Sequence, residues 1–344
     1  MRATGASDGP RGLPRRVLVT GANGLIGTEL CHRLHRRGHR VRALCGPAAA
    51  AAGPPAGAEV TNGDILDAGL LAELVVDMDT VVHLAGPPSV SESFQAPVAF
   101  ARVHVDGTVM LLEACRATQV RRFVYVSSAE IYGRWARQPV HEEAPTDPAS
   151  PYAAAKLGAE AFVRSFAHHA PVEVAIVRPF LVYGPGQSPR SLVAELVRQV
   201  STGEPVRLRD PRPVRDLVHA RDVAAALEAA SFARLVEPAR TFNVASGAGI
   251  STLALARMLL ELAGGEPTVD ARTADRPAAA QVLELVGDVR RARKELGYRP
   301  EVRLEDGLIE LLWIERRGAA SHASTSGRDG SPGLHRQILR SPRA

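Results

Sequence analysis

Short apolar runs rich in β-branched residues alternate with amphipathic stretches along the first half of the chain. Such alternation is typical of strands that are each followed by a helix. The predicted strands are Val17–Thr20, Arg40–Leu44, Glu59–Thr61, Thr80–Leu84, Phe123–Ser127 and Val172–Val177. The predicted helices of the same region are 25–37, 67–76, 98–118 and 150–169.

The first predicted helix illustrates the amphipathic pattern. Its apolar residues Leu25, Ile26, Leu30 and Leu34 fall on one face, and its basic residues fall largely elsewhere. Strands that alternate with such helices form βαβ units, so the predicted fold class is α/β, a doubly wound parallel sheet of the Rossmann type. Ligands bind such a sheet at the carboxyl ends of its strands, near the point where the strand order reverses.

The alternation loosens after about residue 180, where helices near 189–202, 221–231, 251–263 and 304–316 are joined by short strands and Pro/Gly-rich turns. We therefore predict a dinucleotide-binding Rossmann domain over 15–180 and a smaller, mainly substrate-binding α/β region over 181–317 that closes over the cleft. The ends, 1–14 and 318–344, lack an apolar period and are predicted to be disordered tails. The Ala/Gly/Pro-rich run 47–57 is predicted to be a mobile surface loop.

Composition narrows the function classes. The 344 residues carry a formal charge of +5, but much of the arginine lies in the two ends, so solvated tails account for most of it. A modest positive field would also suit a doubly anionic substrate. No aromatic platform is interleaved with the basic residues, so no nucleic-acid partner is expected.

The cysteines and the hydropathy indicate the compartment. Cys31, Cys45 and Cys115 show no close pairing spacing, which predicts free thiols in a reducing compartment. None has a neighbouring histidine or cysteine at metal-ligand spacing, so no metal is expected. No apolar run approaches the ~18 residues of a membrane span, and no apolar signal core is present. We expect a cytoplasmic protein without a membrane partner.

A glycine-rich turn, Gly21-Ala22-Asn23-Gly24-Leu25-Ile26-Gly27, follows the first predicted strand. Glycine lets the backbone bend sharply and approach a ligand closely. The helix behind the turn directs its free N–H groups and positive dipole end toward an anion, typically a pyrophosphate. A tight structural turn is the alternative. The candidate cofactor-binding residues of this turn are Gly21, Asn23, Gly24, Leu25, Ile26 and Gly27.

The evidence on the cofactor's adenosine half is mixed. An NAD site usually has an acid at the end of the second strand, but here that strand runs into Cys45-Gly46. Arg42 either meets the 2′-phosphate of NADP or is a surface residue, so both NAD and NADP stay open. After the third strand, Asp64 either contacts the adenine, beside Ile65, or caps the next helix. Small residues over which a cofactor could pass end the fourth strand: Leu84, Ala85 and Gly86.

Tyr152 and Lys156 stand four residues apart, so both side chains project from one face of a predicted helix. A lysine ammonium stabilises a phenolate, as does the positive nicotinamide of an oxidised cofactor. Both effects move the tyrosine pKa from about 10 toward the working pH, so that Tyr152 can take or give a proton. Ser128, at the tip of the fifth strand, could hydrogen-bond the reacting oxygen. The alternatives are a helix surface for the pair and a turn former for the serine.

Together these segments resemble the extended short-chain dehydrogenase/reductases, over roughly residues 15–316. This group contains nucleotide-sugar epimerases, dehydratases, decarboxylases and 4-ketoreductases. The match is specific to the family and much weaker for any single reaction. The matching segments are Thr20–Gly27, Gly63–Ile65, His83–Ala85, Ser127–Gly133, Pro151–Lys156, Arg178–Gly186, Arg215–His219, Phe242–Val244 and Leu296–Pro300.

The resemblance implies a mechanism. Tyr152 would deprotonate the sugar C4 hydroxyl while hydride leaves C4 for the nicotinamide, or the reverse. Ser128 would share that hydrogen-bond network, and Lys156 would bind the ribose and lower the tyrosine pKa. The three glycines would frame the pyrophosphate.

The resemblance also implies a substrate contact and an assembly. Arg215 falls where the family places an arginine on the nucleotide diphosphate; an ion pair with Asp216 or Asp222 is the alternative. The family's dimers pair the helices expected at 98–118 and 150–169, which predicts a homodimer. Apolar positions such as Val109, Leu112 and Phe162 would serve equally well in the core.

Departures from the family pattern separate the reactions. The Asp-Glu pair of 4,6-dehydratases would occupy positions 129 and 130, but 129 is alanine, so elimination loses its acid. Glu130 remains as a catalytic candidate, as in nucleotide-sugar decarboxylases. Those enzymes also hold the sugar carboxylate with an arginine near 285–288, for which Arg276 is the candidate here. Leu181 replaces a substrate-contacting asparagine, and the segment around it is similar to that of deoxysugar 4-ketoreductases.

The sequence therefore favours redox chemistry at C4 of a nucleotide-activated sugar, with NAD or NADP as cofactor. An NDP-sugar 4-epimerase is the first hypothesis and an NADPH-dependent NDP-deoxysugar 4-ketoreductase the second. A UDP-glucuronate-type decarboxylase is the third. A cofactor-sensing regulator on the same fold is the non-enzyme alternative, and the presence of Tyr152, Lys156 and Ser128 argues against it.

Overall fold

A computed structural model of the chain describes residues 14–46, 55–134, 137–203, 205–265, 268–271 and 282–326. Its centre is a seven-stranded sheet in the order β10-β6-β5-β4-β1-β2-β3, and every neighbouring pair is parallel. The strand order reverses between β1 and β4. The strands are β1 (Arg16–Thr20), β2 (Arg40–Cys45), β3 (Glu59–Asn62), β4 (Thr80–His83), β5 (Arg122–Val126), β6 (Glu173–Pro179) and β10 (Ala239–Val244). The predicted doubly wound α/β fold is confirmed.

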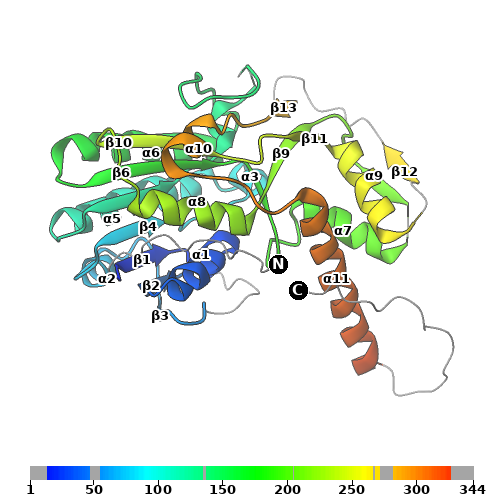
Figure 1. Cartoon of the computed structure of the whole chain (residues 1–344), viewed down its shortest axis with the longest axis horizontal. Helices are drawn as coiled ribbons and strands as arrows, with labels where there is room; N and C mark the ends of the chain where they lie inside the picture. Colours follow the sequence, from blue (N-terminus) through cyan, green and yellow to red (C-terminus); the bar gives the residue numbers. More distant parts are fainter. Residues whose placement is uncertain are drawn as a thin grey trace, which may run out of the picture.

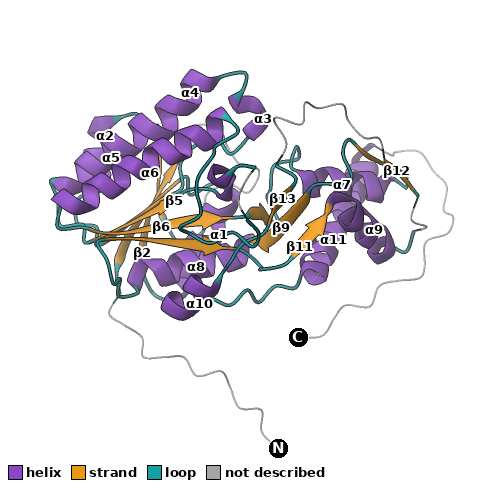
Figure 2. Ribbon diagram, turned by 90° about the horizontal axis from the view of Figure 1, so that it is seen from above, coloured by secondary structure: helices purple, strands orange, loops and turns teal. Residues whose placement is uncertain are grey.

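Helices cover both faces of this sheet (Figure 2). One face carries α2 (Ala68–Leu74), α5 (Gly107–Arg116) and α6 (Pro151–His169). The other carries α1 (Leu25–Arg36), α8 (Ala220–Phe232) and α10 (Arg290–Leu296).

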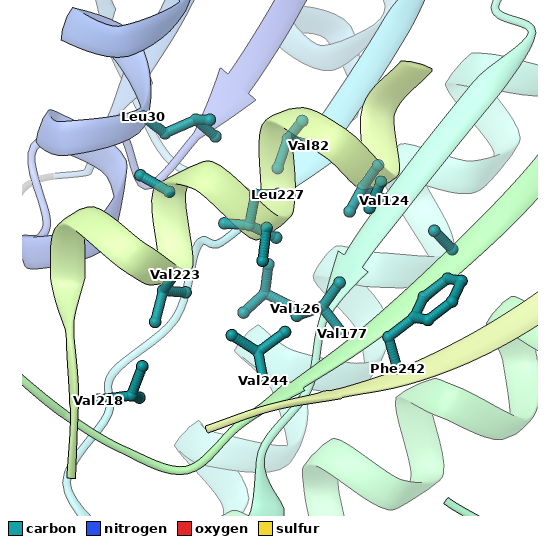
Figure 3. Packing of buried hydrophobic residues seen from close by; sticks show 14 of the residues in the cluster. Leu30, Val82, Val124, Val126, Val177, Val218, Val223, Leu227, Phe242 and Val244 are labelled. Atoms are coloured by element: carbon teal, nitrogen blue, oxygen red, sulfur yellow. The ribbon is translucent and has the colours of Figure 1, made fainter. Parts of the chain in front are cut away.

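The two covered faces explain the apolar strands. Val17 and Val19 of β1 pack into the core cluster beneath α1 and α8, whereas Leu18 between them packs under α2, α5 and α6. Successive strand side chains point to opposite faces, so a strand buried on both sides is apolar throughout. Figure 3 shows the first cluster, with Leu227 of α8 near Val126 and other strand side chains.

The C-terminal region has its own apolar core, to which α7, α9 and α11 contribute. These helices gather at one end of the molecule, away from β1–β3 (Figure 1). Strand β9 pairs with β7, β11 and β13, while β8 pairs with β12. The elements are β7 (Leu181–Tyr183), α7 (Leu192–Thr202), β8 (Val206–Leu208), β9 (Val214–His219), β11 (Gly249–Ser251), α9 (Thr252–Ala263), β12 (Val269–Ala271), β13 (Glu284–Leu285) and α11 (Leu304–Ser326).

The single helix predicted over 98–118 is wrong. The chain forms α4 (Pro97–Ala101), a π-helical turn η1 (Arg102–Asp106) and then α5; the short helix α3 (Val90–Ser93) precedes them. A π turn fits an extra residue into the helix. Here it accompanies a histidine, His104, that is only 1% exposed. The apolar period of the sequence does not encode such a turn.

The predicted C-terminal tail also begins too early. Helix α11 continues to Ser326, so the first nine residues of the predicted tail, 318–326, are helical. Once a helix is nucleated each further residue adds a hydrogen bond, and Ala319, Ala320 and Ala323 favour its continuation. Residues 327–344, the N-terminal tail up to residue 13 and most of the predicted loop, 47–54, lie outside the described residues.

A buried ion pair fastens α6 to β6. Nε and Nη2 of Arg178 donate to the two carboxylate oxygens of Glu160 at 2.9 and 2.7 Å. The side chains of Glu160 and Arg178 are 1% and 4% exposed. Nη1 of Arg178 also donates to the Tyr132 hydroxyl at 2.8 Å and to the Glu142 carbonyl at 2.9 Å. One guanidinium therefore joins the helix, the strand and two loop segments.

Replacing Arg178 by methionine should destabilise the fold strongly. The Glu160 carboxylate would stay buried without its partner, which costs about 3–5 kcal/mol. We expect this loss in the free energy of unfolding measured by urea denaturation. The matched control is Arg116→Met, which removes an exposed pair with Glu113 and should stay within about 0.5 kcal/mol of wild type. Equal losses in the two variants would contradict the account.

Candidate active site

The glycine-rich turn packs directly against the tip of β4. Gly21 has φ +68°, and a Cβ at this position would lie 2.8 Å from the Ala85 nitrogen. A Cβ at Gly27 would lie 2.3 Å from the Gly21 carbonyl oxygen. Gly24 is the N-cap of α1 and makes no side-chain capping hydrogen bond, so no side chain covers the first N–H groups there. The turn thus fits a phosphate group bound against bare backbone at a helix N-terminus.

The other predicted residues of the turn lie at this helix start. Leu25 and Ile26 open α1 and are partly exposed. Asn23 donates from Nδ2 to the Gly46 carbonyl at 3.2 Å, which ties the turn to the end of β2. Leu84, Ala85 and Gly86 follow at the tip of β4 and are also partly exposed. The predicted residues that follow β1 and β4 therefore lie together, next to the end of β2.

At the end of β3, Asp64 is exposed and its carboxylate accepts from the Leu66 nitrogen at 3.0 Å. The N-cap of α2 is Asp67, which accepts from the Leu70 nitrogen at 3.0 Å, so the capping role considered for Asp64 is wrong. Ile65 is buried, and its side chain lies against Gly107.

Arg42, the residue considered for a 2′-phosphate, is engaged elsewhere. Its Nη1 donates to the carbonyls of Leu74 and Val76 at 3.0 and 3.2 Å, and its Nε donates to Glu59 at 3.4 Å. These contacts agree with the second of the two predictions for Arg42, that it is a surface residue and not a ligand of a 2′-phosphate.

Tyr152, Lys156 and Ser128 meet where α6 passes the tip of β5. Ser150 caps α6 by accepting from the Ala153 nitrogen at 3.1 Å, so the helix starts just before Tyr152. The Ser128 hydroxyl lies close enough to the Tyr152 phenol to affect its pKa. Lys156 Nζ donates to the Val126 carbonyl at 2.8 Å. The predicted common face of Tyr152 and Lys156 is present, and it points toward the predicted serine.

Burial dominates the titration of this cluster. It raises the pKa of Tyr152 to about 12, against the lowering effect of the Ser128 hydrogen bond and with a further raising effect from Glu130. The lowering expected with an oxidised cofactor bound stays a prediction, whereas in the protein without cofactor the tyrosine pKa is raised. Burial also lowers the pKa of Lys156 to about 7, and the charge of Glu160 opposes this.

Arg215 of β9 lies near the carboxylate of Glu130, whose charge opposes the lowering of the arginine pKa by burial. Its guanidinium donates to the carbonyls of Val282 and Val214 at 2.8 and 3.0 Å. Glu130, behind the Ser128 N-cap of η2 (Ala129–Tyr132), thus influences both Tyr152 and Arg215.

The proposed ion pairs of Arg215 are wrong. Asp216 instead accepts from the Ser246 nitrogen at 2.7 Å, and Asp222 accepts from the Glu301 nitrogen at 2.9 Å. Both aspartates are occupied in holding loops. Arg276, the candidate for a sugar carboxylate, lies outside the described residues.

His104 is a site residue that the sequence analysis missed. Its ring centroid lies 5.5 Å from that of Tyr152 with an interplanar angle of 75°. Its Nε2 lies 3.1 Å from the Pro87 carbonyl, and its ring fills the space where a Cβ on Gly86 would stand. Glu160 was also missed, although its position four residues after Lys156 was a usable signal.

Metal-binding clusters and membrane-spanning helices are absent from the described part of the chain. No cluster of three or more histidine, cysteine, aspartate or glutamate side chains there could hold a metal ion. None of the helices in that part is long and apolar enough to cross a membrane.

The comparison with protein families gives one match. The model of the NAD dependent epimerase/dehydratase family covers residues 17–245. Among curated relatives, UDP-glucose 4-epimerase of Mycolicibacterium smegmatis is 34% identical over 314 residues, which are 86% of this chain and 97% of the relative. dTDP-glucose 4,6-dehydratase of Streptomyces antibioticus is 31% identical over 309 residues, covering 86% and 91% of the two chains.

Solved structures agree with this assignment. MoeE5 in complex with UDP-glucose and NAD matches with a TM-score of 0.79 and 32% identity, covering 88% of this chain and 99% of the other. RMD from Pseudomonas aeruginosa complexed with NADPH matches with a TM-score of 0.76 and 27% identity, with the same coverages. The curated relatives thus include an epimerase and a dehydratase, and the similar solved structures contain NAD or NADPH.

The family match, the parallel sheet and the glycine-rich turn lead to one conclusion. The chain belongs to the NAD-dependent epimerase/dehydratase family of the extended short-chain dehydrogenase/reductases, and it is an NAD(P)-dependent enzyme of nucleotide-sugar metabolism.

Proposed function

We propose that the protein is an NDP-sugar 4-epimerase that oxidises and re-reduces C4 of its substrate within one turnover. The observation that carries the proposal is the cluster of Tyr152, Ser128 and Lys156, in which a phenol, a hydroxyl and an ammonium meet in a buried site. The residue beside it, Ala129, supplies no acid for an elimination.

The cofactor would bind across the tips of β1 and β4. Backbone N–H groups after Gly24 would hold its pyrophosphate, since Gly21 and Gly27 leave no side chain in the way. Asn23, Ile65 and the strand end at Leu84–Gly86 would line its path. A bound nicotinamide supplies a reversible hydride acceptor next to the tyrosine.

Side chains of this protein would carry out the proton transfers. Tyr152 takes the proton of the C4 hydroxyl and later returns one to the C4 oxygen. Ser128, which lies close enough to the phenol to affect its pKa, would hydrogen-bond the C4 oxygen and hold it in place. Lys156 binds the ribose hydroxyls and stabilises the phenolate by its charge. Because burial raises the pKa of the phenol to about 12, a nearby positive charge would favour the first step.

Arg215 and Glu130 would serve the substrate. A guanidinium suits a diphosphate because it donates two parallel hydrogen bonds to phosphate oxygens. Glu130 acts electrostatically on both Arg215 and Tyr152, so it would face the substrate between its diphosphate and its reacting carbon. Arg276 stays a further candidate for substrate binding.

Elimination of water between C5 and C6 requires an acid beside the tyrosine, as in the dehydratases. Ala129 is only 2% exposed and belongs to the core cluster that includes α8, so this position offers no acid. This supports epimerisation over dehydration, although both reactions occur among the relatives.

NADPH-dependent 4-ketoreduction is the second candidate. The observation in its favour is Cys45 at the end of β2, where an NAD-binding acid is usual. The structural similarity to an enzyme complexed with NADPH supports the same alternative. A UDP-glucuronate-type decarboxylase is a third candidate, supported by Glu130.

We also propose a homodimer and a reducing, cytoplasmic location. Phe162 on α6 is 50% exposed and would be covered by a second copy, whereas Leu112 on α5 lies in the core. The thiols of Cys31, Cys45 and Cys115 are free and buried, as in proteins of reducing compartments.

Replacing Tyr152 by phenylalanine should lower turnover by about 100-fold or more, because it removes the group that exchanges the proton. Binding of NAD, followed by the quenching of protein fluorescence, should stay as in wild type. The control is Tyr183→Phe, which removes a buried hydroxyl of the C-terminal core and should leave turnover unchanged. Normal turnover of Tyr152→Phe would remove the catalytic assignment.

Replacing Gly27 by alanine should weaken cofactor binding by about tenfold or more, or at least about 1.4 kcal/mol. Its Cβ would lie 2.3 Å from the Gly21 carbonyl and force the turn open. Isothermal titration with NAD and NADPH measures the effect. Gly318→Ala on α11, where a Cβ meets nothing within 4 Å, is the control. Equal affinities in the two variants would argue against the proposed cofactor site.

Incubation with UDP- and dTDP-sugars separates the three reactions. We expect a C4-inverted sugar without added cofactor, together with NAD released on denaturation. Consumption of added NADPH by a 4-keto sugar would instead support the ketoreductase. Release of CO₂ from a UDP-uronic acid would support the decarboxylase.

A further inference from the structure

Three ionisable side chains form one stripe along α6. Tyr152, Lys156 and Glu160 are spaced by four residues, so they lie on the same face of the helix. They are 8%, 5% and 1% exposed. The proposed chemistry uses the first two and leaves the most deeply buried one without a role.

The carboxylate of Glu160 is held rigidly and in its charged form. Arg178 binds both of its oxygens at 2.9 and 2.7 Å, and Arg164 approaches Oε2 at 3.4 Å. Burial acts to raise the pKa of Glu160, but the hydrogen bonds and charge of Arg178 outweigh it and the pKa is lowered. The charge is therefore fixed one helical turn from Lys156.

The remaining groups around Lys156 supply no second negative charge in the described part of the chain. On β5, the Val126 carbonyl accepts a hydrogen bond from Lys156 Nζ, and the ring centroid of Tyr125 lies 5.2 Å from the same nitrogen. Burial is the first cause that lowers the pKa of His83 of β4 to about 3 and of His104 of η1 to about 2. Both histidines are neutral, as is the phenol of Tyr152.

We propose that Glu160 is a positioning residue of the active site, whose fixed carboxylate keeps Lys156 protonated beside Tyr152. Arg178 holds the carboxylate in place, and Lys156 transmits its effect to the phenol. Two buried groups one turn apart interact in a medium that screens charge far less than water. Burial pushes Lys156 toward its neutral form, and Glu160 is the charge that opposes this.

A purely structural role for the ion pair does not explain why charged residues stand at positions 160 and 178. Fastening α6 to β6 does not require charges, because well-packed apolar residues often replace a buried ion pair without loss of stability. A carboxylate in this position, one helical turn from Lys156, instead opposes the loss of the lysine's charge on burial. The inference rests on the proposed role of Lys156, but its test reads the lysine itself and not turnover.

The chain offers a direct measurement, because Lys156 and Lys294 are its only lysines. Lys294 is exposed on α10, so Lys294→Arg leaves a protein with one lysine. The pKa of Lys156 is then followed by NMR of the labelled side chain in the cofactor-free protein. We expect a value near 7 with Glu160 present. Glu160→Gln should lower it by about one unit or more.

Three variants separate the effect of the Glu160 charge on Lys156 from the effect of the Glu160–Arg178 pair on stability. Glu160→Gln leaves Arg178 unpaired and destabilises the fold, so the double variant Glu160→Leu/Arg178→Met provides the second measurement. It should fold and still show the lowered pKa of Lys156. Arg164→Gln, at a side chain that is 39% exposed, removes a neighbour of Glu160 but keeps the pair with Arg178, and should leave the pKa unchanged.

An unchanged Lys156 pKa in a folded protein without Glu160 would overturn the inference. The pH profile of turnover gives a second readout. If Lys156 acts as proposed, activity in Glu160→Gln declines at lower pH than in wild type. If the pKa moves and this profile does not, the inference about Glu160 stands and the proposed role of Lys156 is wrong.

Discussion

The ion pair between Glu160 and Arg178 is the constraint on which the side-chain half of the site depends. It joins α6 to β6 inside the protein, and the same guanidinium reaches Tyr132 and the Glu142 carbonyl. Because α6 is a continuous helix, fixing Glu160 also fixes Lys156 and Tyr152 one and two turns earlier. The pair is costly to bury, and in our proposal the carboxylate of Glu160 acts on the lysine. Stability and chemistry are thus coupled through one contact.

The other half of the site is made of backbone. Strand order reverses between β1 and β4, and the turn after β1 packs against the tip of β4 with no room for side chains at Gly21 and Gly27. A helix N-terminus without a capping side chain then points at this opening. The rigid backbone would hold the cofactor, and the stripe on α6 would supply the protons. Family membership is shown by the sequence and structural comparisons, whereas the reaction depends on a few side chains such as Ala129 and Glu130.

Features with a local signature were predictable from the sequence. The strands were apolar because both sheet faces are covered, and the common face of Tyr152 and Lys156 followed from their spacing. Features that depend on tertiary contacts were not. The π turn that buries His104 leaves the apolar pattern of 98–118 unchanged, and the partner of Glu160 lies on β6. The raised pKa of Tyr152 in the protein without cofactor depends on burial, which the sequence does not quantify.

The central claim is that hydride leaves C4 of a nucleotide sugar and returns to the same carbon. The most direct measurement follows UDP- and dTDP-hexoses deuterated at C4 by NMR, without added cofactor. The account predicts a C4-inverted product that keeps its deuterium at C4, because the label never exchanges with water. Inversion with loss of deuterium to solvent would contradict it, since the proton would then be removed from carbon and not from the hydroxyl.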